Sequence, residues 1–206
     1  MHMNDEPMTA HDQGPRSRTA EAILDVAETL IQTRGFSAFS YQDIADALGI
    51  RKANIHYHFP SKADLGAAVI DRYSARFAAV LAAICKDPDT SSMAILDYYI
   101  EPYQQLAETS DRICLCGALA GEMMALPEGL RLRVDRFFRA HQTWLAGILK
   151  RGGERGEFKR DIPAAKMARL IFAALQGALI VKRTTGETTQ FSDVVAGVRS
   201  RILGDA

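Results

Sequence analysis

Apolar residues recur at helical spacing along almost the whole chain after residue 16. Ile23, Val26, Ala27, Leu30 and Ile31 form the first such stripe, and residues three or four apart share one face of an α-helix. No segment alternates apolar and polar residues for long enough to demand a β-sheet. The sequence therefore predicts an all-α protein.

Capping residues and helix breakers divide this pattern into about nine helices. Ser40 with Asp43, and Ser61 with Asp64, have the spacing of capping boxes at two helix starts. Pro60 ends the helix before it, because proline disfavours the α conformation of the preceding residue. Helices are expected over residues 17–34, 41–48, 51–59, 63–84, 92–108, 115–125, 128–151, 164–184 and 192–203.

These helices predict a compact three-helix head and a larger helical body, joined by the long fourth helix. Residues 16–62 form the expected head and residues 63–206 the expected body. Residues 1–15 contain proline, glycine and scattered charges but no apolar run. They are expected to be a disordered lead-in rather than a signal peptide.

Composition sets the broad class of protein. Hydrophobic residues make up 48% and charged residues 24% of the chain, which is typical of a soluble globular protein. No window approaches the roughly 18 uninterrupted apolar residues of a membrane span, and three cysteines, an odd number, favour reduced thiols in a cytoplasm. The net charge is zero, so a claim of nucleic-acid binding must rest on local geometry.

Two short helices joined by a tight turn with a glycine are typical of a helix-turn-helix. Ile44, Ala45 and Ile55 belong to the apolar set that would pack these helices together. The second helix of such a motif can lie in the major groove of DNA, with side chains near its start at base edges. That helix leaves a set of hydrogen-bond donors exposed: Arg51, Lys52, Asn54, His56, Tyr57 and His58.

The segment SAFSYQDIADALGIRKANIHYHFPSKADL resembles the DNA-binding signature of the TetR/AcrR family of transcriptional repressors. The preceding segment RTAEAILDVAETLIQTRGF is similar to that family's first helix, including the final RGF. The resemblance is strong over residues 18–73, and the later helices agree with the family in number, length and order. His56 departs from the pattern, because the family usually carries tyrosine there.

The resemblance implies a cytoplasmic homodimer that binds double-stranded operator DNA and responds to a small-molecule effector in the body, with no membrane association. Its two recognition helices would enter successive major grooves about 34 Å apart. The residues expected on DNA are Arg18, Ser40, Tyr41, Gln42, Lys52, Ala53, Asn54, His56, Tyr57, His58 and Lys62.

His56 and His58 also raise the alternatives of a metal site or a catalytic pair. They are two residues apart, which puts them on different faces of a helix, whereas metal-binding pairs on helices prefer spacings such as that of H-E-x-x-H. No nucleophile or carboxylate is placed to partner either histidine. The sequence therefore predicts no metal, no cofactor and no enzyme.

The body carries large apolar residues, most of which are expected in its core. Polar-tipped members such as Tyr103, His141 and Trp144 could line an effector cavity, and Glu122, if it faces inward, would need a partner. The expected ligand-binding residues are Phe77, Tyr99, Tyr103, Cys114, Glu122, Met123, Phe138, His141, Trp144, Phe172 and Gln176.

Cys114 and Cys116 leave two interpretations open. Cysteine often serves as a small buried hydrophobe, and a C-x-C pair cannot readily close an unstrained disulfide. A helix N-terminus lowers a thiol's pKa, however, and several TetR-like repressors of electrophile or reductase pathways resemble this segment, with a cysteine eight residues before a glutamate, as Cys114 precedes Glu122. The alternative function is thus a redox- or electrophile-responsive repressor switched by modification of Cys114.

The segment ARLIFAALQGALIVKR, residues 168–183, is apolar and interspersed with small residues. Such a helix is expected to be buried on more than one side. It would form a four-helix dimer interface together with residues 192–203.

Overall fold

The computed structural model describes residues 17–203, so the lead-in predicted at residues 1–15 lies outside the described part. Within that part the chain forms nine helices and no strand, which confirms the predicted all-α fold. The helices are α1 (Arg18–Arg34), α2 (Tyr41–Leu48), α3 (Lys52–His58), α4 (Lys62–Ile84), α5 (Ser92–Glu108), α6 (Leu115–Gly121), α7 (Glu128–Glu154), α8 (Ala164–Thr185) and α9 (Gln190–Leu203).

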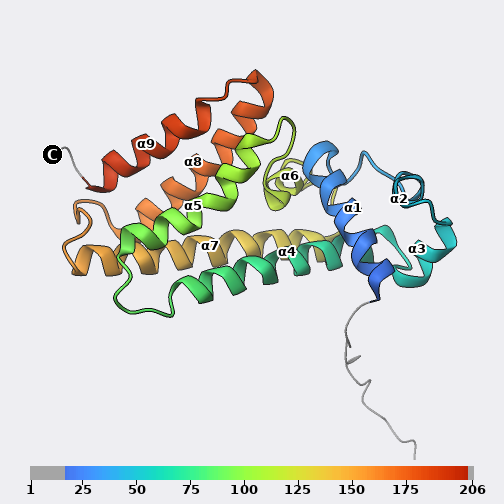
Figure 1. Ribbon diagram of the computed structural model, residues 1–206, viewed down its shortest axis with the longest axis horizontal. Coiled ribbons are helices and arrows are strands. Elements are labelled where there is room, and N and C mark those ends of the chain that lie inside the picture. The colour runs from blue at the N-terminus through green and yellow to red at the C-terminus, as the bar shows by residue number, and fades with distance from the viewer. Residues whose placement is uncertain (1–16, 204–206) are drawn as a thin grey trace, which may run out of the picture.

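The nine helices form an elongated molecule with a small head at one end (Figure 1). Helices α1, α2 and α3 make the head. Helix α4 leaves the head and runs along the body beside α7, while α5, α8 and α9 lie on the other side of α7. The short α6 packs against α1, so it stands where the body meets the head.

Local capping explains where the head helices begin. The Ser40 amide donates to the Asp43 carboxylate at 2.7 Å, and the Ser61 amide donates to Asp64 at 3.0 Å, so both predicted capping boxes are present. Gly49 ends α2 in the left-handed conformation (φ 65°, ψ 32°), which glycine adopts without steric cost. This residue makes possible the tight turn that sends the chain into α3.

The head has its own apolar core. Ile23, Ile44 and Ile55, from three different helices, are completely buried, and burying a side chain of this size contributes about 1.5–3 kcal/mol. The Tyr41 hydroxyl donates to the Phe59 carbonyl at 2.8 Å, which ties the start of α2 to the end of α3. The two helices of the motif are therefore held at a fixed angle.

Ion pairs join the head to the helix that carries it. Arg72 on α4 contacts three carboxylates of α1 at 2.8–3.0 Å, those of Glu21, Asp25 and Glu28. Arg76 pairs with Glu28 as well. These ion pairs therefore fasten α1 to α4.

The predicted helix over residues 115–125 is shorter in the structure, because α6 ends at Gly121. Tight turns replace it, in which the Glu122 amide donates to Leu119 at 3.0 Å and the Ala125 amide to Glu122 at 2.8 Å. The Glu122 carboxylate bonds to the head instead of lying along a longer helix. A contact outside the helix thus sets its end.

Of the described helices, α8 has the length and apolar composition to cross a membrane, and 39% of its most apolar window is buried. Leu175 and Leu179 lie fully inside the body, where α8 packs on α7 and α9. A second stripe of α8 is open to the surface: Leu170 (53%), Ala173, Ile180 (43%) and Val181 (41%) are exposed, and Gly177 among them is half-buried. The helix is therefore apolar on both sides, one covered by this chain and one open.

Candidate nucleic-acid interface and the core of the body

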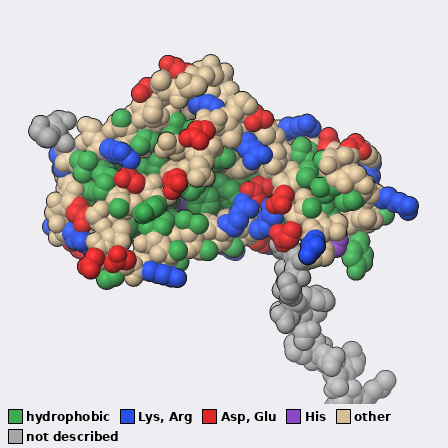
Figure 2. Space-filling view, viewed as in Figure 1, with side chains coloured by type: hydrophobic (Ala, Val, Ile, Leu, Met, Phe, Trp, Pro, Cys, Tyr) green, Lys and Arg blue, Asp and Glu red, His purple; other side chains and the backbone are tan. Residues whose placement is uncertain are grey.

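Helix α3 presents polar side chains at the outer end of the head. Lys52, Ala53 and Asn54 in its first turn are exposed, and Tyr57 is 84% exposed, whereas Ile55 is buried beneath them. At this end of the molecule Figure 2 shows Lys or Arg and His side chains beside hydrophobic groups, with Asp and Glu side chains along the upper edge. The exposed first turn has the groups that read base edges: lysine for guanine, asparagine for adenine and a methyl for thymine.

Local charge favours an anionic partner here although the whole chain is neutral. Among the described residues, Arg51 and Lys52 have no ion-pair partner, whereas Arg34 is paired with Asp43 at 3.4 Å and Arg72 with α1. Arg18 is also exposed and unpaired within the described part of the chain. The unpaired cations of the head therefore include Arg18 and Lys52, two of the residues that the sequence predicts to contact DNA.

The side chains at the start of α2 differ in exposure. Ser40 and Gln42 are exposed, and the Ser40 hydroxyl also takes part in the capping box. Tyr41 is buried, and its burial, together with the nearby Asp64 carboxylate, raises the pKa of its hydroxyl to about 12. The structure thus places Tyr41 inside the head, where it holds the end of α3.

His56 lies between the buried Tyr41 and the exposed surface of α3. Its ring packs edge-on against Tyr41 with centroids 4.7 Å apart, and its Nδ1 is 3.3 Å from the Pro60 carbonyl oxygen. The side chain remains exposed, as does the neighbouring Tyr57, whose ring contacts the half-buried His58 at 5.1 Å. His56 therefore also stabilises the end of α3.

Lys62 turns into the head rather than outward. Its ammonium donates to the Phe39 carbonyl and lies 4.8 and 4.3 Å from the ring centres of Phe36 and Phe39. Burial lowers the pKa of Lys62, against the opposing effect of the Glu122 and Asp43 carboxylates. The sequence predicted a phosphate contact for this residue, but here the side chain holds the α1–α2 loop.

Glu122 reaches the same loop from the body. Its Oε1 accepts from the Phe36 amide at 2.6 Å and its Oε2 from the Ser37 amide at 2.8 Å. Gly35 has a positive φ of 93°, and a Cβ there would lie 2.2 Å from Glu122 Oε1. Glu122 and the adjacent Met123 therefore lie at the junction with the head. No sequence pattern indicates this contact, because its donors are backbone amides.

Seven predicted ligand residues meet in one aromatic cluster inside the body. Tyr99 is at its centre, with its hydroxyl 3.1 Å from His141 Nδ1 and 3.3 Å from the Tyr103 hydroxyl. Burial lowers the pKa of His141 to about 4, so this imidazole is neutral at pH 7. The cluster consists of Phe77, Tyr99, Tyr103, Phe138, His141, Trp144 and Phe172.

Comparison with known proteins places both halves of the chain. Residues 23–69 match the family described as bacterial regulatory proteins, tetR family, and residues 93–198 match the tetracyclin repressor-like C-terminal domain. The chain belongs to the TetR family. The resemblance found in the sequence is thereby confirmed, and the protein is a DNA-binding transcriptional regulator of the TetR type.

TetR relatives match over nearly the full length. The HTH-type transcriptional repressor DhaR of Mycobacterium sp. (strain GP1) is 25% identical over 187 residues, 87% of this chain and 91% of DhaR. The crystal structure of a TetR transcriptional regulator from Legionella pneumophila is 34% identical with a TM-score of 0.82, covering 91% of this chain and 98% of that one. A TetR-family regulator from Agrobacterium tumefaciens is 33% identical with a TM-score of 0.84, covering 90% and 97%.

The two cysteines at the start of α6 lie deep in this TetR body. Cys114 and Cys116 are both completely buried, and burial raises the pKa of the Cys116 thiol. The Tyr73 hydroxyl donates to Cys114 Sγ at 3.7 Å. Gln176 is buried near them, beside Gly117, and its Nε2 has no hydrogen-bond partner within the described residues. This burial favours a structural or pocket-lining role for Cys114 over a thiol that reagents reach directly.

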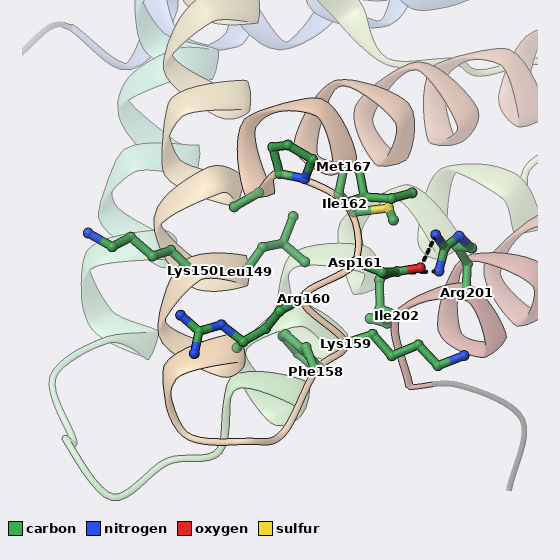
Figure 3. Close-up of a pocket in the computed structure, with 13 residues that line it drawn as sticks. Leu149, Lys150, Phe158, Lys159, Arg160, Asp161, Ile162, Met167, Arg201 and Ile202 are labelled. Carbon is green, nitrogen blue, oxygen red and sulfur yellow. Dashed lines mark hydrogen bonds and ion pairs between the residues drawn. The ribbon is translucent and has the colours of Figure 1, made fainter.

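A surface pocket of about 210 Å³ lies at the end of the TetR body far from the head (Figure 3). Arg201 is paired with Asp161 at 2.7 Å. Lys150 and Arg160 point to one side of this pocket and Lys159 to the other. These cations do not converge on a common point, so the pocket has no assembled anion site.

Proposed function

We propose that the protein is a repressor that binds a near-palindromic operator as a homodimer and is released by a small-molecule effector bound in the body. The proposal rests mainly on the exposed first turn of α3, where the side chains of Lys52 and Asn54 have no polar partner within the described chain while Ile55 is buried beneath them. Acting on chromosomal DNA, the protein would work in the cytoplasm.

The proposed DNA contacts follow from the exposed side chains of the head. Lys52, Ala53 and Asn54 would face base edges. Phosphate oxygens would be bound by Arg18, Ser40, Gln42, His56, Tyr57 and His58, which fix register rather than sequence. Tyr41 would act from inside the head, through its bond to the Phe59 carbonyl.

The proposed dimer interface is the open apolar stripe of α8 together with α9. Leu170, Ile180 and Val181 flank Ala173 and Gly177 at helical spacing, and small residues let two helices approach closely. A second copy that packs its own stripe on this one would form a symmetric four-helix interface. Two heads related in this way could occupy half-sites one helical turn apart.

Release requires that the effector favour a conformation in which the two heads no longer match the operator. Helix α4 supports this coupling because it belongs to both the head and the body. Arg72 ties it to α1, and Glu122 ties α6 to the loop after α1. Movement of α4 or α6 would therefore displace the head.

Binding to DNA from the region upstream of the protein's own gene tests the proposal directly. Fluorescence anisotropy should give a saturable complex in which Arg18→Ala, at a proposed phosphate contact, lowers the slope of log K against log salt by about one. Asn54→Ala should cost about 1–3 kcal/mol and relax the preference at one base pair. Lys150→Ala, an exposed lysine at the far end of the body, is the matched control. Equal affinities for all four proteins would refute the proposed interface.

A further inference from the structure

A long groove runs between α4 and α7 on the surface of the body. Its volume is about 470 Å³, which is within the usual range of small-molecule sites, roughly 300–1,000 Å³. Small side chains create the depression, since Ala78 and Ala82 of α4 face Ala140 of α7 across it. The groove therefore results from alanine at positions where two packed helices would ordinarily carry larger residues.

The floor of the groove is apolar. Ile70, Leu81 and Phe137 line it and are themselves buried. Trp144 lies towards the end that is far from the head, stacked on Tyr99 of the aromatic cluster. Along α4 and its C-cap the lining residues extend from Ile70 to Cys85, about 22 Å at the rise per residue of an α-helix. Such a surface suits an elongated apolar group.

Charge gathers at the end of the groove that is nearer the head. Arg133 Nε donates to both carboxylate oxygens of Asp71, at 3.0 and 3.1 Å, and its Nη1 donates to the Gly129 carbonyl at 2.9 Å. Arg136, one turn further along α7, is exposed and has no polar partner within the described residues. The lining therefore includes two guanidinium groups and one carboxylate, and the neutral His141 adds no charge.

We propose that this groove is the effector site and that the effector is an amphipathic monoanion. Its carboxylate would be bound by Arg136 and by the free edge of Arg133, since guanidinium groups bind carboxylates through paired hydrogen bonds. Its alkyl or aryl body would lie along the alanines over the apolar floor. The inference rests on the proposed function only in calling the bound anion an effector.

The position of the carboxylate explains how binding reaches the head. The Asp71–Arg133 pair joins α4 to α7 at the residue next to Arg72, which ties α4 to α1 of the head. A ligand carboxylate at Arg133 competes with Asp71 and weakens this connection. Helix α4, with α1 attached through Arg72, is then freer to move relative to the body.

Trp144 is the single tryptophan of the chain, so intrinsic fluorescence reports on this groove. The purified full chain is titrated with decanoate, decylammonium and 1-decanol, which share a chain length and differ in charge. Decanoate should give a saturable change in emission, and the other two should bind at least about tenfold more weakly, the equivalent of roughly 1.4 kcal/mol. Similar binding of all three would refute the anion preference, and no saturable binding of decanoate would refute the site.

Three variants separate the groove from general apolar binding. Arg136→Ala should raise the Kd for decanoate about tenfold or more, and Ala78→Phe should abolish binding by filling the groove. Arg139→Ala removes an arginine that is outside the groove and paired with Asp135 at 2.8 Å, so it should bind decanoate as the wild type does. Circular dichroism confirms that each variant is folded, and equal Kd values for Arg136→Ala and Arg139→Ala would overturn the proposal.

These titrations contain no DNA, so their failure leaves the proposed function intact. The regulatory step is tested by adding decanoate to the preformed operator complex, where the wild type should dissociate and Arg136→Ala should not. If decanoate binds in the groove but the operator complex persists, the effector assignment is wrong. If decanoate binds and no operator complex forms at all, the proposed function fails instead.

Discussion

At the scale of single residues, His141 makes stability depend on pH. Burial holds its folded-state pKa at about 4, below the ordinary value of 6.5. Between pH 6.5 and pH 4 the imidazole is therefore protonated in the unfolded chain and neutral in the folded chain. The contribution of His141 to stability is complete above pH 6.5 and decreases as the pH drops towards 4. We expect a loss of about 2 kcal/mol between pH 7 and pH 5 from this group.

Urea unfolding at pH 7 and pH 5 measures this effect. The glutamine in His141→Gln cannot be protonated in this range. Between pH 7 and pH 5 the free energy of unfolding of this variant should therefore fall by about 2 kcal/mol less than that of the wild type. The comparison cancels the titration of the other groups, which both proteins share. An identical pH dependence in the two proteins would show that His141 is not the titrating group.

Lys62 permits a second test, because its structural contacts and its expected DNA contact make different predictions. Its ammonium donates to the Phe39 carbonyl and lies over two aromatic rings. We expect Lys62→Ala to lower the free energy of unfolding by about 1–2 kcal/mol and to leave the salt dependence of operator binding unchanged. A fall of about one in the salt slope, as for a lost phosphate contact, would support the role predicted from the sequence instead.

Distance along the chain decides which residue roles could be predicted from the sequence. Ser40 and Asp43 are three residues apart, so their capping box could be predicted from spacing alone. The partner of Lys62 is 23 residues away, and that of Glu122 is 86 residues away. In both contacts one partner is a backbone group, which every residue type carries. No pattern of side chains therefore indicates either contact.

At the scale of elements, the end of α6 is fastened to the loop between α1 and α2. The Glu122 carboxylate accepts two backbone hydrogen bonds from Phe36 and Ser37, and Gln at this position keeps only one acceptor. We expect Glu122→Gln to lower the free energy of unfolding by about 2 kcal/mol, since hydrogen bonds to charged groups contribute about 1.5–3 kcal/mol. Hydrogen exchange of the Phe36 and Ser37 amides should become faster.

Glu101→Gln is the matched control, since Glu101 is exposed on α5 and has no polar partner within the described residues. A double-mutant cycle adds a geometric check. Gly35→Ala places a Cβ 2.2 Å from Glu122 Oε1, so it should be less destabilising in a Glu122→Ala background. Strictly additive effects would contradict the contact.

Helix positions could be predicted well because capping and periodicity are local. The range 92–108 was predicted as it is found, and α6 was predicted four residues too long. Its end depends on the contact of Glu122 with another part of the molecule. The α4–α7 groove was missed for a similar reason. Arg133, Arg136 and Ala140 share a helix face by spacing, but only the packing of α4 against that face makes a groove.

At the scale of the whole molecule, α4 links three features that are distant in the sequence. It carries the head, it pairs with α1 through Arg72, and it forms one wall of the groove with α7. One helix thus connects the head with the groove in the body. Small rotations of α4 would be magnified at α3, because the head lies at one extremity of the long axis (Figure 1).

The proposed dimer is tested at Gly177, in the middle of the open stripe of α8. Beyond its chain neighbours and the backbone of its own helix, a Cβ there would meet no atom of the described residues within 4 Å, and replacing a helical glycine with leucine favours the helix by up to about 1 kcal/mol. Gly177→Leu should therefore leave the single chain folded or slightly more stable, while its bulk keeps two stripes apart. Sedimentation velocity should show a dimer for the wild type and mainly monomer for the variant.

Gly147→Leu is the matched control, because Gly147 is an exposed glycine of α7 with open space beside it, away from the stripe. It should remain dimeric. Since a single head binds one half-site, Gly177→Leu should also bind the operator far more weakly than Gly147→Leu does, although both carry an unchanged α3. A dimeric Gly177→Leu protein with normal operator affinity would show that the two chains associate through another surface.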